Sequence, residues 1–487
     1  MIRLLTIAIL AVTALSCSLS DGGGFLYGES FDGDGFVGET GGDRFDKVAE
    51  NPFIKTKRQN VSTFSVDADG ASYAIMRKYV ETGWSVESAS VRIEEYLNYF
   101  TFDYAEPTGD EMVAINAETG RCPWDDEHRL LRLGLKGKSL SDSELPLSNY
   151  VFLVDVSGSM SSSDKLDLLK TSLTTLLDYL RPEDRISIVT YSGEVRKLLE
   201  STPVKEASKI KAAIGKLKAS GGTAGGKAIE MAYEEALSNF IKDGNNRVIL
   251  GTDGDFNVGV TDPDALAELV EGYARKGIYL TVCGFGSGNL NDSMMKKISI
   301  KGNGTYQYID SEGEMAKVFV QERSRFVSVA NDTKVQITFD PEVVDSYRLI
   351  GYERRVMDNK DFDDDTKDAG EIGAGQTITA LYEIVPAEGY KDGAVCGKFD
   401  CRYKKSLLDT KSRELSTDVA VTEGEMSSEL SFASGVAAYG LTLLDSEYKG
   451  SASLNMASEL VAAGLAFDPY GYRSQLLDLI SKVKVEK

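Results

Sequence analysis

The feature that most constrains the fold is a regular alternation of apolar strands and amphipathic helices between residues 149 and 309. Strands are expected at 150–155, 186–191, 247–251, 278–283 and 305–309, and helices at 164–180, 205–217, 226–241, 263–276 and 289–300. The expected strands are continuously apolar, which is typical of strands with both faces covered. This alternation predicts an α/β fold class: a doubly wound, mostly parallel, Rossmann-like sheet with helices on both sides.

Strand-like segments flank this α/β region on both sides. Strands are expected near 62–66, 112–115 and 129–135 before it, and at 335–339, 347–352, 376–384 and 398–403 after it. Helices are expected at 71–82 and 90–100, and at the end of the chain at 428–444, 453–463 and 471–482. An economical arrangement is one β-rich, sandwich-like domain built from both flanks, with the α/β domain inserted and helices at the C-terminus.

The N-terminus has the features of an export signal. Arg3 precedes an apolar run that is too short to span a bilayer and ends in small residues before Cys17. This pattern is typical of a lipoprotein signal, so we expect Cys17 to be lipidated; a cleaved signal with an incidental cysteine is the alternative. Ser18 is no obvious inner-membrane retention signal. We therefore expect an exported protein, lipid-anchored in the cell envelope at the outer membrane, facing the periplasm or the surface.

The expected division of the chain follows from these patterns. The glycine-rich stretch after Cys17 cannot bury a core and predicts a flexible tether. The expected parts are a signal peptide (1–16), a tether (17–59), an N-terminal mixed region (60–145), the α/β domain (146–327), a β-rich region (328–420) and a C-terminal helical region (421–487).

Composition narrows the possible functions. The formal net charge of −22 argues against binding to nucleic acid, which needs clustered Lys and Arg. The single histidine, His128, leaves little room for catalytic triads or His-rich zinc sites. Cys283 lies in an apolar run and is expected to be buried and free. Cys122, Cys396 and Cys401 could supply one disulfide, but the sequence does not select the pair.

The candidate metal site lies on three segments. Asp155, Ser157 and Ser159 follow a buried strand, so they stand at the carboxyl end of the sheet, where doubly wound folds bind ligands. Thr223 lies in a glycine-rich segment before a helix, and Asp253 follows another apolar strand. These three hydroxyls and two carboxylates are hard oxygen ligands that suit a divalent cation, Mg²⁺ first, with Mn²⁺ or Ca²⁺ as alternatives. Because few of them are anionic, the ion can still attract a carboxylate from outside.

This pattern resembles the metal-ion-dependent adhesion site (MIDAS) of the von Willebrand factor A (VWA) domain, and the five positions match it one for one. The resemblance implies that Ser157, Ser159 and Thr223 bind the ion directly and that Asp155 and Asp253 act mainly through bound waters. It also implies that an Asp or Glu of a protein ligand completes the coordination shell.

Further segments are similar to an exported bacterial lipoprotein family. Its members combine an N-terminal von Willebrand-associated region, a central VWA domain, here 146–327, and a C-terminal domain of unassigned function. The similar segments are 64–69, 91–95, 123–124, 252–259, 347–353, 368–375 and 379–383.

The expected function is metal-ion-dependent protein binding of the adhesion type in the cell envelope. The alternative is a structural or assembly scaffold in which the metal only stabilises the fold. We do not expect an enzyme, because no base or substrate pocket is evident, and Ser157 as a nucleophile has no histidine in its motif.

Three weaker candidates remain. Asp67 and Asp69 could bind Ca²⁺, although a turn and helix cap is favoured because the run lacks the spacing of an EF-hand loop. The acidic run 361–365 could hold a cation, although a solvated loop is favoured. Asp255 could orient the MIDAS from behind its ligands.

Overall fold

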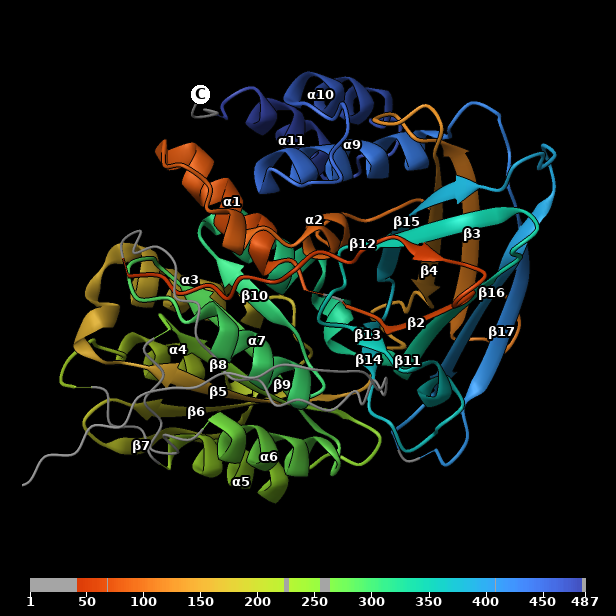
Figure 1. The fold of residues 1–487 in the computed structure, drawn as a ribbon. Helices are drawn as coiled ribbons and strands as arrows, with labels where there is room; N and C mark the ends of the chain where they lie inside the picture. Colours follow the sequence, from red (N-terminus) through yellow and green to blue (C-terminus); the bar gives the residue numbers. More distant parts are fainter. Residues whose placement is uncertain (1–41, 68, 223–226, 255–262, 408, 484–487) are drawn as a thin grey trace, which may run out of the picture. The chain divides into compact units, whose positions relative to one another are not determined.

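The computed structural model describes residues 42–67, 69–222, 227–254, 263–407 and 409–483 (Figure 1). The expected signal peptide (1–16) and Cys17 lie outside the described residues. Among the helices of the described part, none combines the length and apolar character needed to cross a membrane.

The α/β domain is built on a parallel sheet with one antiparallel edge. In spatial order its strands are β10 (Tyr306–Ile309), β9 (Ile278–Phe285), β8 (Asn245–Thr252), β5 (Ser148–Asp155), β6 (Arg185–Tyr191) and β7 (Val195–Pro203). β5 pairs with β6 on one side and with β8 on the other, both in parallel, and only β7 runs antiparallel to its neighbour β6. The winding of the chain therefore reverses between β5 and β8, which makes the carboxyl ends of these two strands the switch point.

Helices cover both faces of this sheet. Along β5, Val151 and Leu153 point into one apolar core, whereas Phe152 and Val154 point into another. The first core includes residues of α5 (Ala228–Ser238), α6 (Pro263–Ala274) and α7 (Asp292–Lys301); the second includes residues of α3 (Leu168–Leu177), α4 (Ala207–Gly215) and α8 (Glu312–Ala316). Figure 1 shows α5 and α6 side by side below the sheet. The expected α/β fold class is confirmed.

Strands from before and after the α/β domain interleave in a sandwich. One antiparallel sheet has the order β1 (Ile54–Lys55), β12 (Val344–Ile350), β15 (Thr377–Pro386), β4 (Arg129–Gly137) and β3 (Val113–Arg121). The other has the order β13 (Val356–Met357), β2 (Val61–Ser65), β11 (Ser328–Phe339), β16 (Val395–Lys404) and β17 (Arg413–Ala420), and β14 (Gly370–Gly373) pairs with β11. A shared apolar core contains Phe64, Leu133, Ile337 and Tyr382. The flanks thus form one domain, and Figure 1 shows β3 (orange) beside β16 and β17 (blue).

The C-terminal helices pack on the N-terminal ones. They are α9 (Ser428–Leu444), α10 (Leu454–Ala463) and α11 (Tyr472–Ile480), and the N-terminal helices are α1 (Ala71–Thr82) and α2 (Ile93–Asn98). Phe432, Val436 and Tyr439 of α9 share a core with Tyr96 and Phe100. A helix buried on nearly all sides needs apolar or small residues on every face, which explains the composition of α9. Figure 1 shows α9, α10 and α11 at the top, in blue.

Short helical turns connect the longer elements. They are η1 (Ser88–Ser90), η2 (Gly158–Ser161), η3 (Ser163–Asp167), η4 (Val204–Glu206), η5 (Lys317–Gln321), η6 (Arg323–Phe326) and η7 (Asn359–Phe362).

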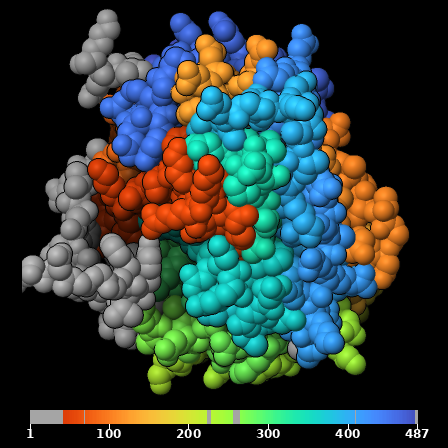
Figure 2. All heavy atoms as spheres, turned by 45° about the vertical axis from the view of Figure 1, so that its right-hand side comes forward, coloured from red at the N-terminus to blue at the C-terminus, as the bar shows by residue number. Residues whose placement is uncertain are grey.

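The expected tether, 17–59, extends too far. Residues 17–41 lie outside the described residues, but parts of the segment 42–59 pack against the rest of the protein (Figure 2, red). Asp43 is 5% exposed, and its Oδ1 accepts hydrogen bonds from the backbone of Gly288 (2.7 Å) and Leu290 (3.0 Å). β1 also pairs with β12. These contacts are long-range, so the local composition could not indicate them.

No strand is expected from the sequence at β7, and the sequence does not decide how the cysteines pair. β7 forms a sheet edge, and exposed charges such as Arg196 and Glu200 hide its strand pattern. The described cysteines, Cys122, Cys283, Cys396 and Cys401, are all buried and free. Cys283 is thus free as expected, and no disulfide forms among the other three.

Candidate metal centre

The first segment of the site is a tight turn after β5. Asp155 is fully buried, and its Oδ1 accepts a hydrogen bond from the backbone N–H of Ser157 at 2.8 Å. The hydroxyl of Thr252, at the end of β8, donates to Oδ2 of Asp155 at 3.3 Å. The carboxylate is therefore held in one orientation by groups from both sides of the switch point.

The two serines of the motif lie together. The hydroxyl oxygens of Ser157 and Ser159 are 2.9 Å apart. Ser157 is 1% exposed, whereas Ser159 is exposed at the start of η2. The pair thus extends from the buried carboxylate towards the surface, and a small ion could meet both hydroxyl oxygens.

The glycine-rich segment is held against the first one by two backbone hydrogen bonds. Ser220 N–H donates to Val156 O at 2.8 Å, and Gly158 N–H donates to Gly221 O at 3.0 Å. Gly221 has φ +80°, a conformation that favours glycine. Thr223, two residues further on, lies outside the described residues, as does Asp255.

Asp253 is the fourth described member of the expected site, and it follows β8. It is fully buried, and its Oδ2 lies 2.9 Å from Nζ of Lys165. The same Nζ lies 3.2 Å from Oδ1 of Asn289. Lys165 and Asn289 are not evident from the sequence, because they come from η3 and from the loop before α7, and no local motif connects either of them with Asp253.

The two carboxylates differ in their electrostatics. Burial raises the pKa of Asp155 to about 6, and the charge of Asp253 adds to this, against the hydrogen bonds from Ser157. Burial also opposes ionisation of Asp253, but hydrogen bonds from Lys165 and Asn289 outweigh it and hold the pKa of that carboxyl below its ordinary value. Ionising Asp155 in the metal-free site therefore costs free energy, and a bound cation would offset that cost.

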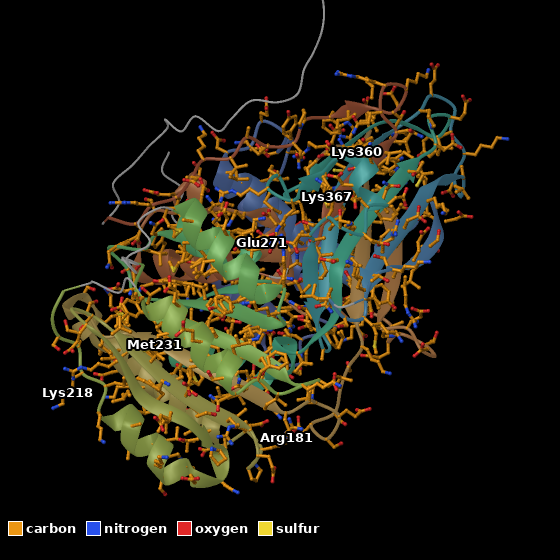
Figure 3. The ribbon with its side chains drawn as sticks, turned by 90° about the horizontal axis from the view of Figure 1, so that it is seen from below. Arg181, Lys218, Met231, Glu271, Lys360 and Lys367 are labelled. Carbon is orange, nitrogen blue, oxygen red and sulfur yellow. The ribbon has the colours of Figure 1, made fainter. Side chains whose placement is uncertain are left out.

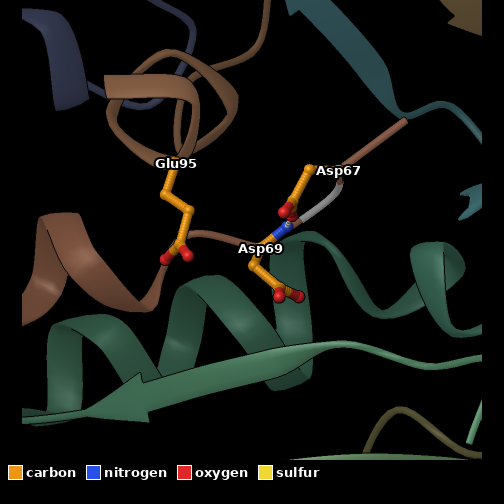
Figure 4. A group of neighbouring side chains, drawn as sticks. All are labelled: Asp67, Asp69 and Glu95. Carbon is orange, nitrogen blue, oxygen red and sulfur yellow. Dashed lines mark hydrogen bonds between the residues drawn. The ribbon is translucent and has the colours of Figure 1, made fainter. Parts of the chain in front are cut away.

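A second acidic cluster lies away from this site. The carboxylates of Asp67, Asp69 and Glu95 converge (Figure 4), and Nζ of Lys296 lies 2.8, 2.8 and 2.7 Å from them. The lysine ammonium takes the place that a calcium ion would need, so these residues form a buried ion-pair cluster.

Asp67 and Asp69 form the expected turn, but neither of them caps the helix that follows. The backbone N–H of Asp69 donates to Oδ1 of Asp67 at 2.9 Å, which is a turn as expected. However, the residue before α1 is Gly70, and the first turn of the helix is capped by Glu95, whose Oε2 accepts a hydrogen bond from the backbone N–H of Ser72 at 2.9 Å. The carboxylates instead form ion pairs with Lys296 and Arg355, which lie far along the chain.

The acidic run 361–365 also forms ion pairs with a basic side chain. Arg402 lies 2.6 Å from Asp363 and 3.0 Å from Asp365. The run is flanked by Lys360 and Lys367 (Figure 3). Nearby, the carboxylate oxygens of Asp332, Asp368 and Glu371 lie within 4.8 Å of one another, and Lys404 Nζ lies 2.6 Å from Asp332.

The comparisons with known proteins agree with this architecture. The sequence model of the von Willebrand factor type A domain matches residues 149–321, and a second von Willebrand factor model matches 39–132. The model described as "Uncharacterized protein YfbK, C-terminal" matches residues 324–485. The fold and these matches define a VWA-domain protein, and domains of this class commonly bind a divalent cation.

The chain is 36% identical over 468 residues to "Uncharacterized protein YfbK" of Escherichia coli (strain K12). The matched region covers 91% of this chain and 81% of the relative. It therefore belongs to a bacterial family that joins a VWA domain to a C-terminal YfbK domain.

More distant relatives match a shorter part. "Inter-alpha-trypsin inhibitor heavy chain H4" of Homo sapiens is 29% identical over 201 residues, which cover 39% of this chain and 21% of that protein. A solved structure, "von Willebrand factor type A from Catenulispora acidiphila", has a TM-score of 0.43 and 16% identity, and covers 77% of this chain and 97% of its own.

Proposed function

We propose that this protein is a metal-dependent protein-binding module of the bacterial cell envelope. Asp155, Ser157, Ser159, Thr223 and Asp253 hold a divalent cation, Mg²⁺ first, and the cation accepts an Asp or Glu of a partner protein. The observation that carries the proposal is the convergence of two fully buried carboxylates, Asp155 and Asp253, with a pair of serine hydroxyls at the switch point: the charge of Asp253 acts on Asp155, and Ser159 hydrogen-bonds Asp253.

The donor set explains why an acidic partner is favoured. Mg²⁺ prefers about six oxygen ligands and usually keeps some waters. The hydroxyls of Ser157 and Ser159 are neutral, and Asp253 is shared with the ammonium of Lys165. An ion in this site therefore keeps positive charge that its surroundings do not cancel, and Ser159 is exposed, so a carboxylate from outside can reach it.

Partner capture tests the proposal. The full mature chain is immobilised, and envelope proteins are passed over it in Mg²⁺ or in chelator. We expect Asp155→Asn to lose the partners that wild type binds in Mg²⁺ and releases in chelator. Asp167→Asn is the matched control, because Asp167 lies near the motif, in η3, but its side chain is 69% exposed.

The same variants separate the proposal from its alternative. If Mg²⁺ stabilises wild type but Asp155→Asn still captures the same partners, the ion serves the fold alone and the protein is a scaffold. If Asp167→Asn also loses the partners, the loss does not report on the metal site.

We also propose that Cys17 carries the lipid that anchors the protein in the envelope, with the outer membrane favoured. The support is the sequence pattern around Cys17. Metabolic labelling with an alkynyl fatty acid should mark wild type and not Cys17→Ser, and the variant should leave the membrane fraction. Unlabelled wild type would contradict the anchor without affecting the metal site.

A further inference from the structure

Lys165 brings a positive charge directly to the candidate metal centre. Its Nζ lies 2.9 Å from Oδ2 of Asp253 and 3.2 Å from Oδ1 of Asn289. Asp253 is fully buried, and the side chain of Lys165 is 10% exposed. The contact is therefore shielded from solvent, where an ion pair interacts far more strongly than on the surface.

The fold is shaped to admit this lysine. Its stem passes over Gly286, just after β9, and a Cβ on Gly286 would lie 2.3 Å from Cε of Lys165. Gly286 has φ +70°, so the backbone conformation also favours glycine there. Lys165 lies in η3, only a few residues after Ser159. The same segment of chain therefore supplies the serine ligands of the metal site and the charge that competes with the metal.

We infer that Lys165 is an internal counter-ion that competes with the divalent cation for Asp253, and that it sets the cation concentration at which the site fills. The inference rests on the proposed metal site and adds its regulation. The two carboxylates carry two negative charges, and Lys165 already neutralises one of them. A divalent cation must either displace the ammonium from Asp253 or bind beside a like charge, and both cost binding free energy.

The inference predicts a gain of affinity on loss of the lysine. Lys165→Met keeps a similar apolar stem but has no charge, so the ion no longer competes with an ammonium for Asp253. We expect the dissociation constant for Mn²⁺ to fall by about tenfold or more, because charges a few ångströms apart in a buried site repel strongly. Lys165→Gln removes the charge but keeps a polar end, so it should also bind Mn²⁺ more tightly than wild type.

The experiment is a calorimetric titration of the full mature chain with MnCl₂ after chelator treatment. It compares wild type, Lys165→Met and Lys165→Gln. The matched control is Lys170→Met, because Lys170 lies on α3, its side chain is 30% exposed, and its ion-pair partner, at 3.5 Å, is the exposed Asp167 and not Asp253. The control should bind Mn²⁺ within about twofold of wild type. Lys165→Gln keeps the test decisive if Lys165→Met does not fold.

The outcomes distinguish the inference from the proposed function. Tighter Mn²⁺ binding by both Lys165 variants supports the inference, even if wild type itself binds none. Equal or weaker binding by folded Lys165 variants, with wild type binding Mn²⁺, overturns the inference and leaves the metal site intact. If neither wild type nor either variant binds Mn²⁺, the metal site and the inference both fail.

Discussion

Nζ of Lys296 lies 2.8 Å from Oδ2 of Asp67, although the two residues are 229 positions apart in the chain. Lys296 belongs to α7 of the VWA domain, and Asp67 follows β2 of the sandwich. The same ammonium contacts Asp69 and Glu95, and Arg355 lies 3.0 Å from Asp67. All of these side chains are buried. The cluster therefore joins the helix that follows β9 to the N-terminal region through charges that have little access to water.

Removing the lysine from this cluster should destabilise the fold strongly. Lys296→Met leaves three buried carboxylates with less positive charge than they need, and breaking a buried ion pair costs about 3 to 5 kcal/mol. Urea denaturation followed by tryptophan fluorescence measures the change. Lys297→Met is the control, because Lys297 is 44% exposed and its partner Asp264 is 81% exposed. It should cost at most about 1 kcal/mol. Equal effects of the two variants would contradict the role assigned to the cluster.

The single histidine should make part of the stability depend on pH. Nδ1 of His128 lies 2.6 Å from Oε1 of Glu383, and this hydrogen bond, against partial burial, raises the pKa of His128 above 6.5. The protonated imidazole thus favours the folded state. Its contribution is complete below pH 6.5 and is lost as the pH rises through the raised pKa.

An NMR titration of histidine-labelled protein reports this pKa without overlap, because the chain has one histidine. The melting temperature of wild type should fall as the pH rises through the raised pKa. His128→Gln should remove the part of this fall that deprotonation of His128 causes. A folded-state pKa at or below 6.5 would contradict the pairing with Glu383.

Two glycines should respond in opposite directions to alanine. Gly286→Ala places a Cβ 2.3 Å from Cε of Lys165 and strains a backbone with φ +70°. It should cost about 1 to 3 kcal/mol. Gly272 lies in α6, and a Cβ there meets nothing within 4 Å. Gly272→Ala should stabilise by up to about 1 kcal/mol, because alanine favours the helix. Thermal melting of both variants checks the pair, and a stabilising Gly286→Ala would refute the close packing of Lys165.

The sequence predicted the parts of this protein that depend on local patterns. The helices expected at 71–82 and 428–444 coincide with α1 and α9, and the position of Asp155 after a buried strand placed it at the sheet edge. Lys165 and Lys296 could not be found in this way, because each meets its partners only after distant segments have folded together. A lysine in a helix usually indicates a solvated face, and here tertiary contacts override that tendency.

The buried carboxylate of Asp155 should make the metal-free protein less stable than its own asparagine variant. Burial raises the pKa of Asp155 to about 6, so in chelator its stability contribution is complete below pH 3.8 and is lost as the pH rises through 6. Asn cannot ionise, and its side-chain oxygen can still accept the hydrogen bond from Ser157. In chelator at pH 7.5, Asp155→Asn should therefore be more stable than wild type by about 1 to 3 kcal/mol. In saturating Mg²⁺ the order should reverse, because only the wild-type carboxylate gains from the ion. Melting curves of both proteins at pH 5 and pH 7.5, with and without Mg²⁺, measure this crossing. If the asparagine variant is less stable than wild type in all four conditions, the ionised Asp155 carboxylate stabilises the metal-free fold, and the predicted cost of its ionisation is absent.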